Sequence, residues 1–211
     1  MRVVYLHGFA SSPQSGKAQY FKRKLNEAGV AVEIPQLDGG RFQDLTITGQ
    51  LAVIEQAVAG QATVLFGSSL GGYLAALCAA RHSEIKRLVL LAPAFQFPSR
   101  WRQRYSPEAL AKWKSDGSVA VYHYGQNREM RLGYQLMEDS AKYEEEPDVQ
   151  QPTLIFHGTK DDVVPAEVSQ TFAKSHPNAE LHLMDSGHEL TDVLEPMWSV
   201  VQKWLAIDRL A

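Results

Sequence analysis

Short apolar segments alternate with segments of helical periodicity along almost the whole chain. A segment that is apolar at consecutive positions fits a strand buried on both faces of a sheet, and strands that alternate with helices pair in parallel. The pattern therefore predicts an α/β fold with about six mostly parallel strands and helices on both faces. The expected strands are residues 3–6, 30–34, 62–66, 86–91, 153–156 and 179–184.

Residues 95–150 interrupt this alternation, because they contain no convincing core strand. Ser106 is suited to cap a helix that starts at Pro107, and a second helical stretch is expected over residues 128–143. The segment begins directly after a predicted strand, at the sheet edge where α/β proteins bind ligands. We therefore expect one domain of residues 1–211 in which residues 95–150 form a helical cap or lid. A surface excursion without function is the alternative.

The sequence Gly67-Ser68-Ser69-Leu70-Gly71 fits the pattern G-x-S-x-G only when Ser69 is the central serine. In this pattern a strand turns sharply into a helix, and glycines are needed on both sides because a side chain there would collide with its neighbours. The turn holds the serine hydroxyl above the sheet, where it can act as a nucleophile. A glycine-rich turn with a structural serine is the alternative, so Ser69 needs identifiable partners.

A nucleophilic serine needs a base that accepts its proton and an acid that orients the base. On α/β sheets these residues follow the serine in the order Asp or Glu, then His. Asp161 and Asp162 come directly after the fifth expected strand, and His188 comes after the sixth. Because these loops leave the same edge of a parallel sheet, the sequence predicts Ser69 as nucleophile and His188 as base.

The acid is less sharply defined than the base. Asp161 lies nearer the strand end than Asp162, which is better placed to stabilise the following helix, so Asp161 is the preferred acid. Asp185 is a third candidate, expected at the end of its own strand. Two further histidines, His7 and His157, precede glycines in turns and are expected to brace loops by hydrogen bonds.

Acyl transfer also requires donors for the oxyanion of the tetrahedral intermediate. One donor is expected to be the backbone N–H of Leu70, directly after the nucleophile. The other should come from the loop after the first strand, where Gly8 allows the Phe9 N–H to face Ser69. An ordinary turn between strand and helix is the alternative for this loop.

Four motifs give the chain a resemblance to a known family: YLHGFASSPQSGKA, PQLDGGRFQDLTI, GSSLGG and HGTKDDVVP. With them the chain resembles the α/β-hydrolase superfamily over its whole length, and within it the small bacterial YqiA-like esterases. The resemblance implies Ser69, Asp161 and His188 as the catalytic triad, in a minimal fold that lacks the first two antiparallel strands. It implies hydrolysis of an ester or thioester and leaves the acyl group open.

The segment 95–150 should determine which substrate is accepted. Its aromatic side chains Phe95, Trp101 and Trp113 are candidates for an apolar acyl pocket, and packing of the cap onto the sheet is an equal alternative. Arg100 and the arginines two and four residues later would suit a phosphorylated carrier such as acyl-CoA, although a solvated basic strip is favoured. The main expectation is a serine esterase for a small or medium acyl group. A thioesterase and a non-catalytic binding protein on the same fold are the alternatives.

Composition narrows the partners. The formal net charge of −3 and the charged fraction of 21% provide no basic footprint for nucleic acid or a membrane surface. One cysteine, Cys78, allows no internal disulfide. The first residues enter strand-like sequence at once, without the pattern of a secretory signal, and no apolar run is long enough to span a bilayer. We expect a cytoplasmic enzyme for a small-molecule ester or thioester, without metal or organic cofactor.

Overall fold

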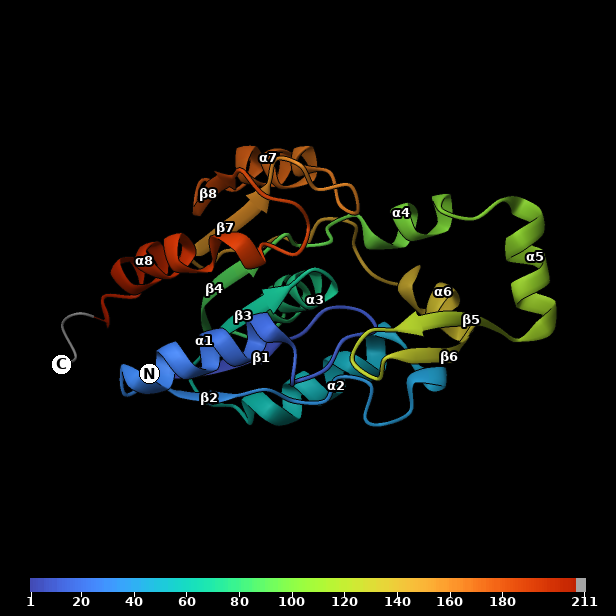
Figure 1. Cartoon of the computed structure of the whole chain (residues 1–211), viewed down its shortest axis with the longest axis horizontal. Coiled ribbons are helices and arrows are strands. Elements are labelled where there is room, and N and C mark those ends of the chain that lie inside the picture. Colours follow the sequence, from blue (N-terminus) through green and yellow to red (C-terminus); the bar gives the residue numbers. More distant parts are fainter. Residues whose placement is uncertain (208–211) are drawn as a thin grey trace.

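The computed structural model describes residues 1–207 of the chain. Six parallel strands form one sheet in the order β2-β1-β3-β4-β7-β8 (Figure 1). All six lie where the sequence predicts them, and no antiparallel strand precedes β1 in the described chain. The strands are β1 (Arg2–Leu6), β2 (Ala31–Glu33), β3 (Thr63–Ser68), β4 (Ile85–Leu91), β7 (Thr153–Gly158) and β8 (Ala179–Met184).

Helices cover both faces of this sheet because its strands are apolar on both sides. Val3 and Tyr5 of β1 pack with α1 and α8, whereas Val4 and Leu6 pack with α2, α3 and α7 on the opposite face. Two short 3-10 helices are also present, η1 (Phe42–Asp44) and η2 (Thr191–Val193). The α-helices are α1 (Gly16–Glu27), α2 (Ile47–Val58), α3 (Leu70–Ala79), α7 (Ala166–Ser175) and α8 (Leu194–Trp204).

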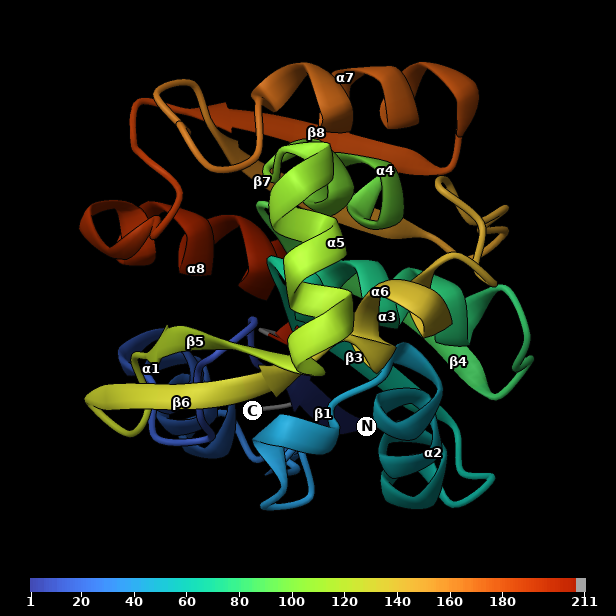
Figure 2. The same cartoon turned by 90° about the vertical axis from the view of Figure 1, so that its right-hand side faces the viewer.

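The segment between β4 and β7, called the insertion below (residues 95–150), lies beyond the carboxyl ends of the strands (Figures 1 and 2). It combines three short helices with a two-stranded antiparallel hairpin. Ser106 caps its second helix by accepting a hydrogen bond from the Ala109 N–H at 3.2 Å, as the sequence predicts. The elements are α4 (Phe97–Gln103), α5 (Pro107–Asp116), β5 (Ser118–His123), β6 (Arg128–Gly133) and α6 (Gln135–Ser140).

The hairpin corrects the expectation of a helical stretch over residues 128–143. β6 pairs with β5 along its whole length, from Arg128 opposite His123 to Gly133 opposite Ser118. The helix-forming side chains of this stretch are overruled by strand pairing, because both partner strands are available on either side of a tight turn. Only α6 at its end is helical.

Hydrogen bonds fasten the insertion to the rest of the fold. The Asp139 carboxylate accepts from the Thr48 N–H at 2.7 Å and the Thr48 hydroxyl at 2.8 Å, at the positive N-terminal end of α2. The Tyr73 hydroxyl donates to the Glu144 carbonyl at 2.7 Å. The insertion is therefore held at its carboxyl side by both α2 and α3.

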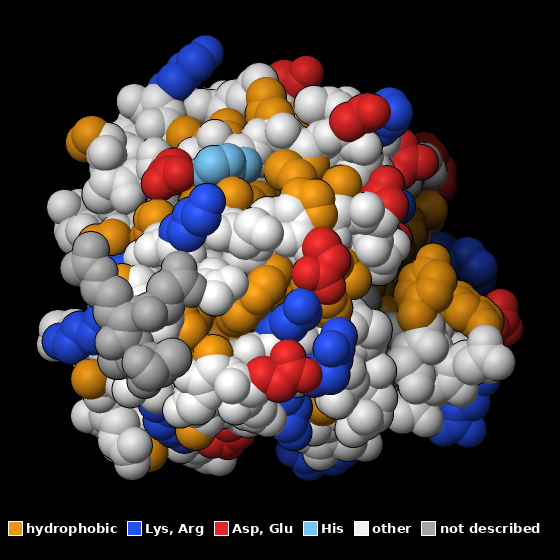
Figure 3. Space-filling model, turned by 60° about the vertical axis from the view of Figure 1, so that its left-hand side comes forward, with side chains coloured by type: hydrophobic (Ala, Val, Ile, Leu, Met, Phe, Trp, Pro, Cys, Tyr) orange, Lys and Arg blue, Asp and Glu red, His pale blue; other side chains and the backbone are white. Residues whose placement is uncertain are grey.

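The surface drawn in Figure 3 shows basic and acidic side chains interspersed, without a continuous patch of either sign. Within residues 1–207, no helix has the combination of length and apolar character needed to cross a membrane.

Two of the three aromatic side chains expected to form an acyl pocket belong to the core instead. Phe95 is fully buried and stacks on Phe172 with ring centroids 4.1 Å apart. Trp113 is buried as well, and its indole N–H donates to the Leu132 carbonyl at 3.1 Å. Neither lines the cavity described below. For these two residues, packing of the insertion onto the sheet is the correct alternative.

Phe95→Ala should therefore destabilise the fold. Removal of a fully buried phenylalanine leaves a cavity and typically costs about 3–5 kcal/mol of unfolding free energy. Urea unfolding would measure the loss. Trp101→Ala, at a half-buried position beside the cavity, is the matched control and should cost less; a smaller loss for Phe95→Ala than for Trp101→Ala would contradict the assignment.

Candidate active site

Ser69 occupies a strained turn between β3 and α3. Its backbone has φ 53° and ψ −118°, a conformation that costs a non-glycine residue on the order of 1–3 kcal/mol. Hydrogen bonds hold it there: the Ser69 N–H donates to the Leu91 carbonyl at 2.9 Å, and the Ser69 carbonyl accepts from the Gly72 N–H at 2.9 Å. The surrounding backbone thus fixes the conformation that exposes the Ser69 hydroxyl.

The flanking glycines are required by close backbone contacts. A Cβ atom on Gly67 would overlap the carbonyl of Gly71, and one on Gly71 would overlap the carbonyls of Leu6 and His7 at the end of β1. These are backbone atoms that cannot move aside. The steric reason for the G-x-S-x-G pattern is therefore visible in the fold.

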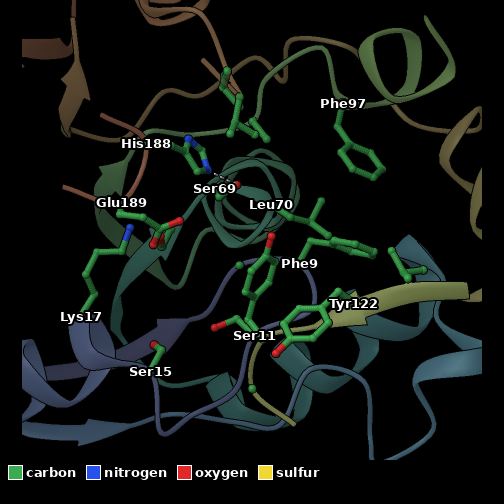
Figure 4. Close-up of a pocket in the computed structure, with 18 of the residues that line it drawn as sticks. Phe9, Ser11, Ser15, Lys17, Ser69, Leu70, Phe97, Tyr122, His188 and Glu189 are labelled. Atoms are coloured by element: carbon green, nitrogen blue, oxygen red, sulfur yellow. Dashed lines mark hydrogen bonds between the residues drawn. The ribbon is translucent and has the colours of Figure 1, made fainter. Parts of the chain in front are cut away.

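The structure brings Ser69, His188 and Asp161 into one chain of hydrogen bonds. The Ser69 Oγ lies 3.0 Å from His188 Nε2 (Figure 4). His188 Nδ1 lies 2.7 Å from Asp161 Oδ2. Because Asp161 Oδ2 can only accept when ionised, the proton of a neutral His188 is placed on Nδ1. His188 Nε2 is then free to accept the proton of the serine hydroxyl.

Asp161 is held from several directions, and its carboxylate is fully buried. Its Oδ1 accepts from the N–H groups of Val163 at 2.9 Å and Val164 at 2.8 Å. Burial opposes ionisation, but hydrogen bonds from His157, His188 and Val164 outweigh it and keep the pKa of Asp161 well below its ordinary value. This carboxylate therefore remains charged at neutral pH.

The other two acidic candidates lie apart from His188. Asp162 is exposed on the wall of the cavity. Asp185 is also exposed and pairs with Lys160 at 2.7 Å. Asp161, which contacts His188, is the candidate that lies nearest to the end of β7.

His157 contacts the same oxygen of this carboxylate as His188 does. It is completely buried, with Nε2 3.2 Å from Asp161 Oδ2 and 2.8 Å from the Val164 carbonyl. Since Nε2 faces two acceptors, it carries the proton, and Nδ1 accepts from the Ser169 hydroxyl at 2.7 Å. The sequence predicts loop bracing by His157 but not its contact with Asp161. The four-residue separation across one turn is the signal that could have revealed it.

The loop after β1 lies against Ser69. A Cβ on Gly8 would be 3.4 Å from the Ser69 Cβ. His7 braces this loop, as expected, by accepting from the Leu37 N–H at 3.3 Å through Nε2. In the described part of the chain, the N–H groups of Phe9 and Leu70 have no acceptor, and both residues line the same cavity as Ser69.

Ser69 and His188 open onto a cavity of about 1160 Å³ between the sheet edge and the insertion. Figure 4 shows two different sides: aromatic side chains such as Phe9 and Phe97 lie on one side of Ser69, and Lys17 and Glu189 lie on the other. Trp101, a substrate-binding candidate from the sequence, also lines the cavity. The apolar lining includes Phe9, Leu70, Phe97, Trp101, Tyr105 and Val121.

Comparison with protein-family models identifies the family of this chain. UPF0227, described as an uncharacterised protein family, matches residues 2–203. The chain belongs to this family. Curated proteins provide no significant sequence match.

Solved structures show that this UPF0227 protein has the fold of α/β hydrolases. Est1E from Butyrivibrio proteoclasticus with ferulic acid bound is similar with a TM-score of 0.84 and 23% identity, over 97% of this chain and 88% of that one. The mouse α/β-hydrolase domain-containing protein 10 has a TM-score of 0.80 and 19% identity, with coverage of 100% and 90%. The monoacylglycerol lipase of Paleococcus ferrophilus has a TM-score of 0.76 and 20% identity, with coverage of 100% and 95%. At these identities the similarity establishes the fold.

Across residues 1–207, no three or more His, Cys, Asp or Glu side chains are grouped so that they could hold a metal ion.

Gly71→Ala should disturb both the fold and the position of Ser69. The new methyl group would overlap backbone carbonyls, and overpacking of this kind costs about 1–3 kcal/mol. Thermal unfolding would measure the loss. Gly16→Ala is the matched control, because a Cβ at Gly16 meets no atom within 4 Å; equal stability of the two variants would contradict the steric argument.

Proposed function

We propose that this protein is a serine hydrolase that cleaves carboxylic esters through an acyl-enzyme on Ser69. The observation that carries the proposal is the hydrogen-bonded chain from Ser69 through His188 to the buried Asp161. Ser69 and His188, at one end of this chain, open onto the cavity. A serine without a catalytic role has no need for a strained turn, an oriented imidazole and a buried carboxylate at the same place.

In the first half of the reaction, Ser69 Oγ attacks the acyl carbon while His188 Nε2 accepts the hydroxyl proton. The electron pair of the carbonyl double bond moves to its oxygen, and the N–H groups of Phe9 and Leu70 donate to this oxyanion. Collapse of the intermediate breaks the ester bond, and His188 gives its proton to the leaving alcohol. The acyl group is then bound to Ser69.

In the second half, His188 accepts a proton from water as the water oxygen attacks the acyl-enzyme. A second oxyanion forms at the same amides. Its collapse breaks the bond to Ser69 Oγ, which recovers its proton from His188, and the carboxylic acid leaves. Asp161 stabilises the imidazolium in both halves and remains ionised throughout.

The cavity favours an apolar or aromatic acyl group. Phe9, Phe97 and Trp101 form a continuous aromatic group, with ring centroids 4.6 Å apart for Phe9 and Trp101 and 5.2 Å apart for Phe97 and Trp101. Figure 4 shows Phe9 beside Leu70, and Phe97 on the same side of Ser69. The similar structure of Est1E holds ferulic acid, which fits the same proposal of an aromatic or apolar acyl side.

An oxygen ester is favoured over the thioester of a phosphorylated carrier. Of the three arginines considered from the sequence, Arg100 and Arg104 line the cavity and Arg102 does not. Arg100 already donates to the Val163 carbonyl at 2.9 Å, and Arg104 lies over the ring of Trp101. These guanidinium groups are thus used within the fold.

Ser69→Ala should abolish hydrolysis of p-nitrophenyl esters tested from acetate to palmitate. Loss of a nucleophilic serine lowers kcat by as much as about 10⁶-fold when it acts as one unit with its base. Spectrophotometric release of p-nitrophenol would measure the rates, and the preferred acyl length would define the size of the apolar side.

Two controls separate the alternatives for Ser69. Covalent labelling of wild-type Ser69 by a fluorophosphonate would distinguish an enzyme from a binding protein, and matched acyl esters and acyl-CoA thioesters would distinguish the two hydrolases. Equal rates of wild type and Ser69→Ala on every substrate would refute the proposed function.

Asp161→Asn should lower kcat by about 10⁴-fold, because the amide cannot stabilise the imidazolium or fix the tautomer of His188. Asp162→Asn is the matched control and should stay within about threefold of wild type, since its side chain is exposed and does not meet His188. Steady-state kinetics with circular dichroism as a check of folding would compare them. A larger loss for Asp162→Asn would assign the acid to that residue.

A further inference from the structure

The side of the cavity opposite the aromatic group contains a lysine that the proposed reaction does not use. Lys17 belongs to the motif SGKA at the start of α1 and lines the cavity with Ser15 and Gly16. Only 8% of its surface is exposed, and its amine points toward the segment that carries His188 and Glu189 (Figure 4). Lysine is rarely buried to this extent unless it is paired.

Lys17 has no such partner. Within residues 1–207, no hydrogen-bond acceptor and no carboxylate oxygen lies within bonding distance of its amine. Burial lowers the pKa of Lys17, and the charges of Glu189 and Asp161 oppose this effect. An unpaired buried cation is costly, and an anion bound beside it would remove that cost.

The backbone at the same place is also suited to an anion. Ser15 is the N-cap of α1, a helix of 12 residues, and its side chain makes no capping hydrogen bond. The N–H groups of Gly16 and Lys17 have no acceptor among the described residues, and the first turn of α1 contains no acidic side chain. Free N–H groups and the positive end of the helix dipole therefore belong to residues that line the same cavity as Lys17.

Glu189 does not satisfy Lys17. No ion pair joins them within 4.0 Å, and Glu189 is exposed, so solvent screens its charge more strongly than that of Lys17. Glu189 directly follows His188, the residue that would protonate the leaving alcohol. A substrate group beside Lys17 would therefore belong to the alcohol part of the ester, and the acyl part would lie on the aromatic side.

We propose that Lys17 and the first-turn amides of α1 bind a carboxylate or phosphate group on the alcohol part of the substrate. The preferred substrates are then esters that join an apolar or aromatic acyl group to an anionic alcohol. This inference rests on the proposed esterase function, because it assigns the two sides of the cavity relative to Ser69. It makes Lys17 a specificity-determining residue rather than a catalytic one.

Three acetate esters with similar phenolic leaving groups test the inference: methyl 3-acetoxybenzoate, 3-acetoxybenzoate and 3-acetoxyphenyl phosphate. The first is neutral, and the other two carry a carboxylate or a phosphate. The readout is the ratio of kcat/KM for each anionic ester to kcat/KM for the neutral ester. We expect a ratio of about ten or more in wild type, since a charge-assisted hydrogen bond to one ligand group is worth that much. The larger of the two ratios distinguishes carboxylate from phosphate.

Lys17→Met keeps the length of the side chain and removes its charge, so the ratio should fall toward one. Lys22→Met is the matched control: it removes the same charge from α1 at a position outside the cavity, and the ratio should remain that of wild type. Glu189→Gln should preserve or raise the ratio. If Glu189→Gln lowered the kcat/KM ratio as much as Lys17→Met does, the role of Lys17 would be to interact with Glu189 and not with the substrate.

A binding measurement separates failure of the inference from failure of the proposed function. Calorimetric titration of 3-hydroxybenzoate and inorganic phosphate into Ser69→Ala should show an anion bound at a Kd that Lys17→Met raises about tenfold. Binding of neither anion, or a wild-type ratio near one with active hydrolysis, overturns the inference alone. Inactivity of wild type on all three esters together with bound anion contradicts the esterase and leaves an anion site. Unchanged thermal unfolding of Lys17→Met would show that the ratio reports recognition and not folding.

Discussion

The contact between the end of β1 and the first turn of α3 is the constraint on which the site depends. The carbonyls of Leu6 and His7 occupy the space that a side chain on Gly71 would need. Because α3 can approach β1 so closely, Ser69 at its start lies directly against Gly8 and the loop that follows β1. The proposed nucleophile and both proposed oxyanion donors are therefore positioned by one backbone contact, before any side chain contributes.

Asp161, the proposed acid, is positioned by a different constraint, namely the free-energy cost of burying a charge. Asp161 is fully buried, and a carboxylate in that environment must have its oxygen atoms satisfied by donors. Two backbone N–H groups and two imidazoles meet it, so the turn after β7 can close only around the ionised carboxylate. His157 lies against Asp161 Oδ2, the same oxygen that His188 contacts, and the two backbone N–H groups hold Oδ1. The orientation of His188 is thus a consequence of how this loop folds, and it need not be acquired when substrate binds.

The sequence predicts structure best where the local residue pattern is compatible with only one conformation. The central strands β1, β3, β4 and β7 have runs of consecutive apolar residues, and burial on both faces accounts for that pattern. The pattern around Ser69 has one register, because glycine is required at two definite distances from the serine. The hairpin of the insertion is different. β6 contains good helix formers, so its strand structure depends on pairing with β5 and not on local preference. Phe95 and Trp101 show the same limit. Both are aromatic and lie in one segment, yet packing against Phe172 takes Phe95 into the core, and no local signal distinguishes the two.

The insertion is joined to the site as well as to the helices beneath it. The Gly125 N–H at the tip of the hairpin donates to the Ala10 carbonyl at 3.2 Å, on the same loop as Phe9. A Cβ on Gly125 would be 2.7 Å from the Ser12 side chain, so the hairpin rests directly on this loop. A displacement of the hairpin would therefore carry the Phe9 N–H with it. For this reason the wall proposed to contact the acyl group and the N–H proposed to stabilise the oxyanion cannot be adjusted independently. Under the proposed function, substrate fit on the aromatic side is coupled through Ala10 to the geometry at Ser69.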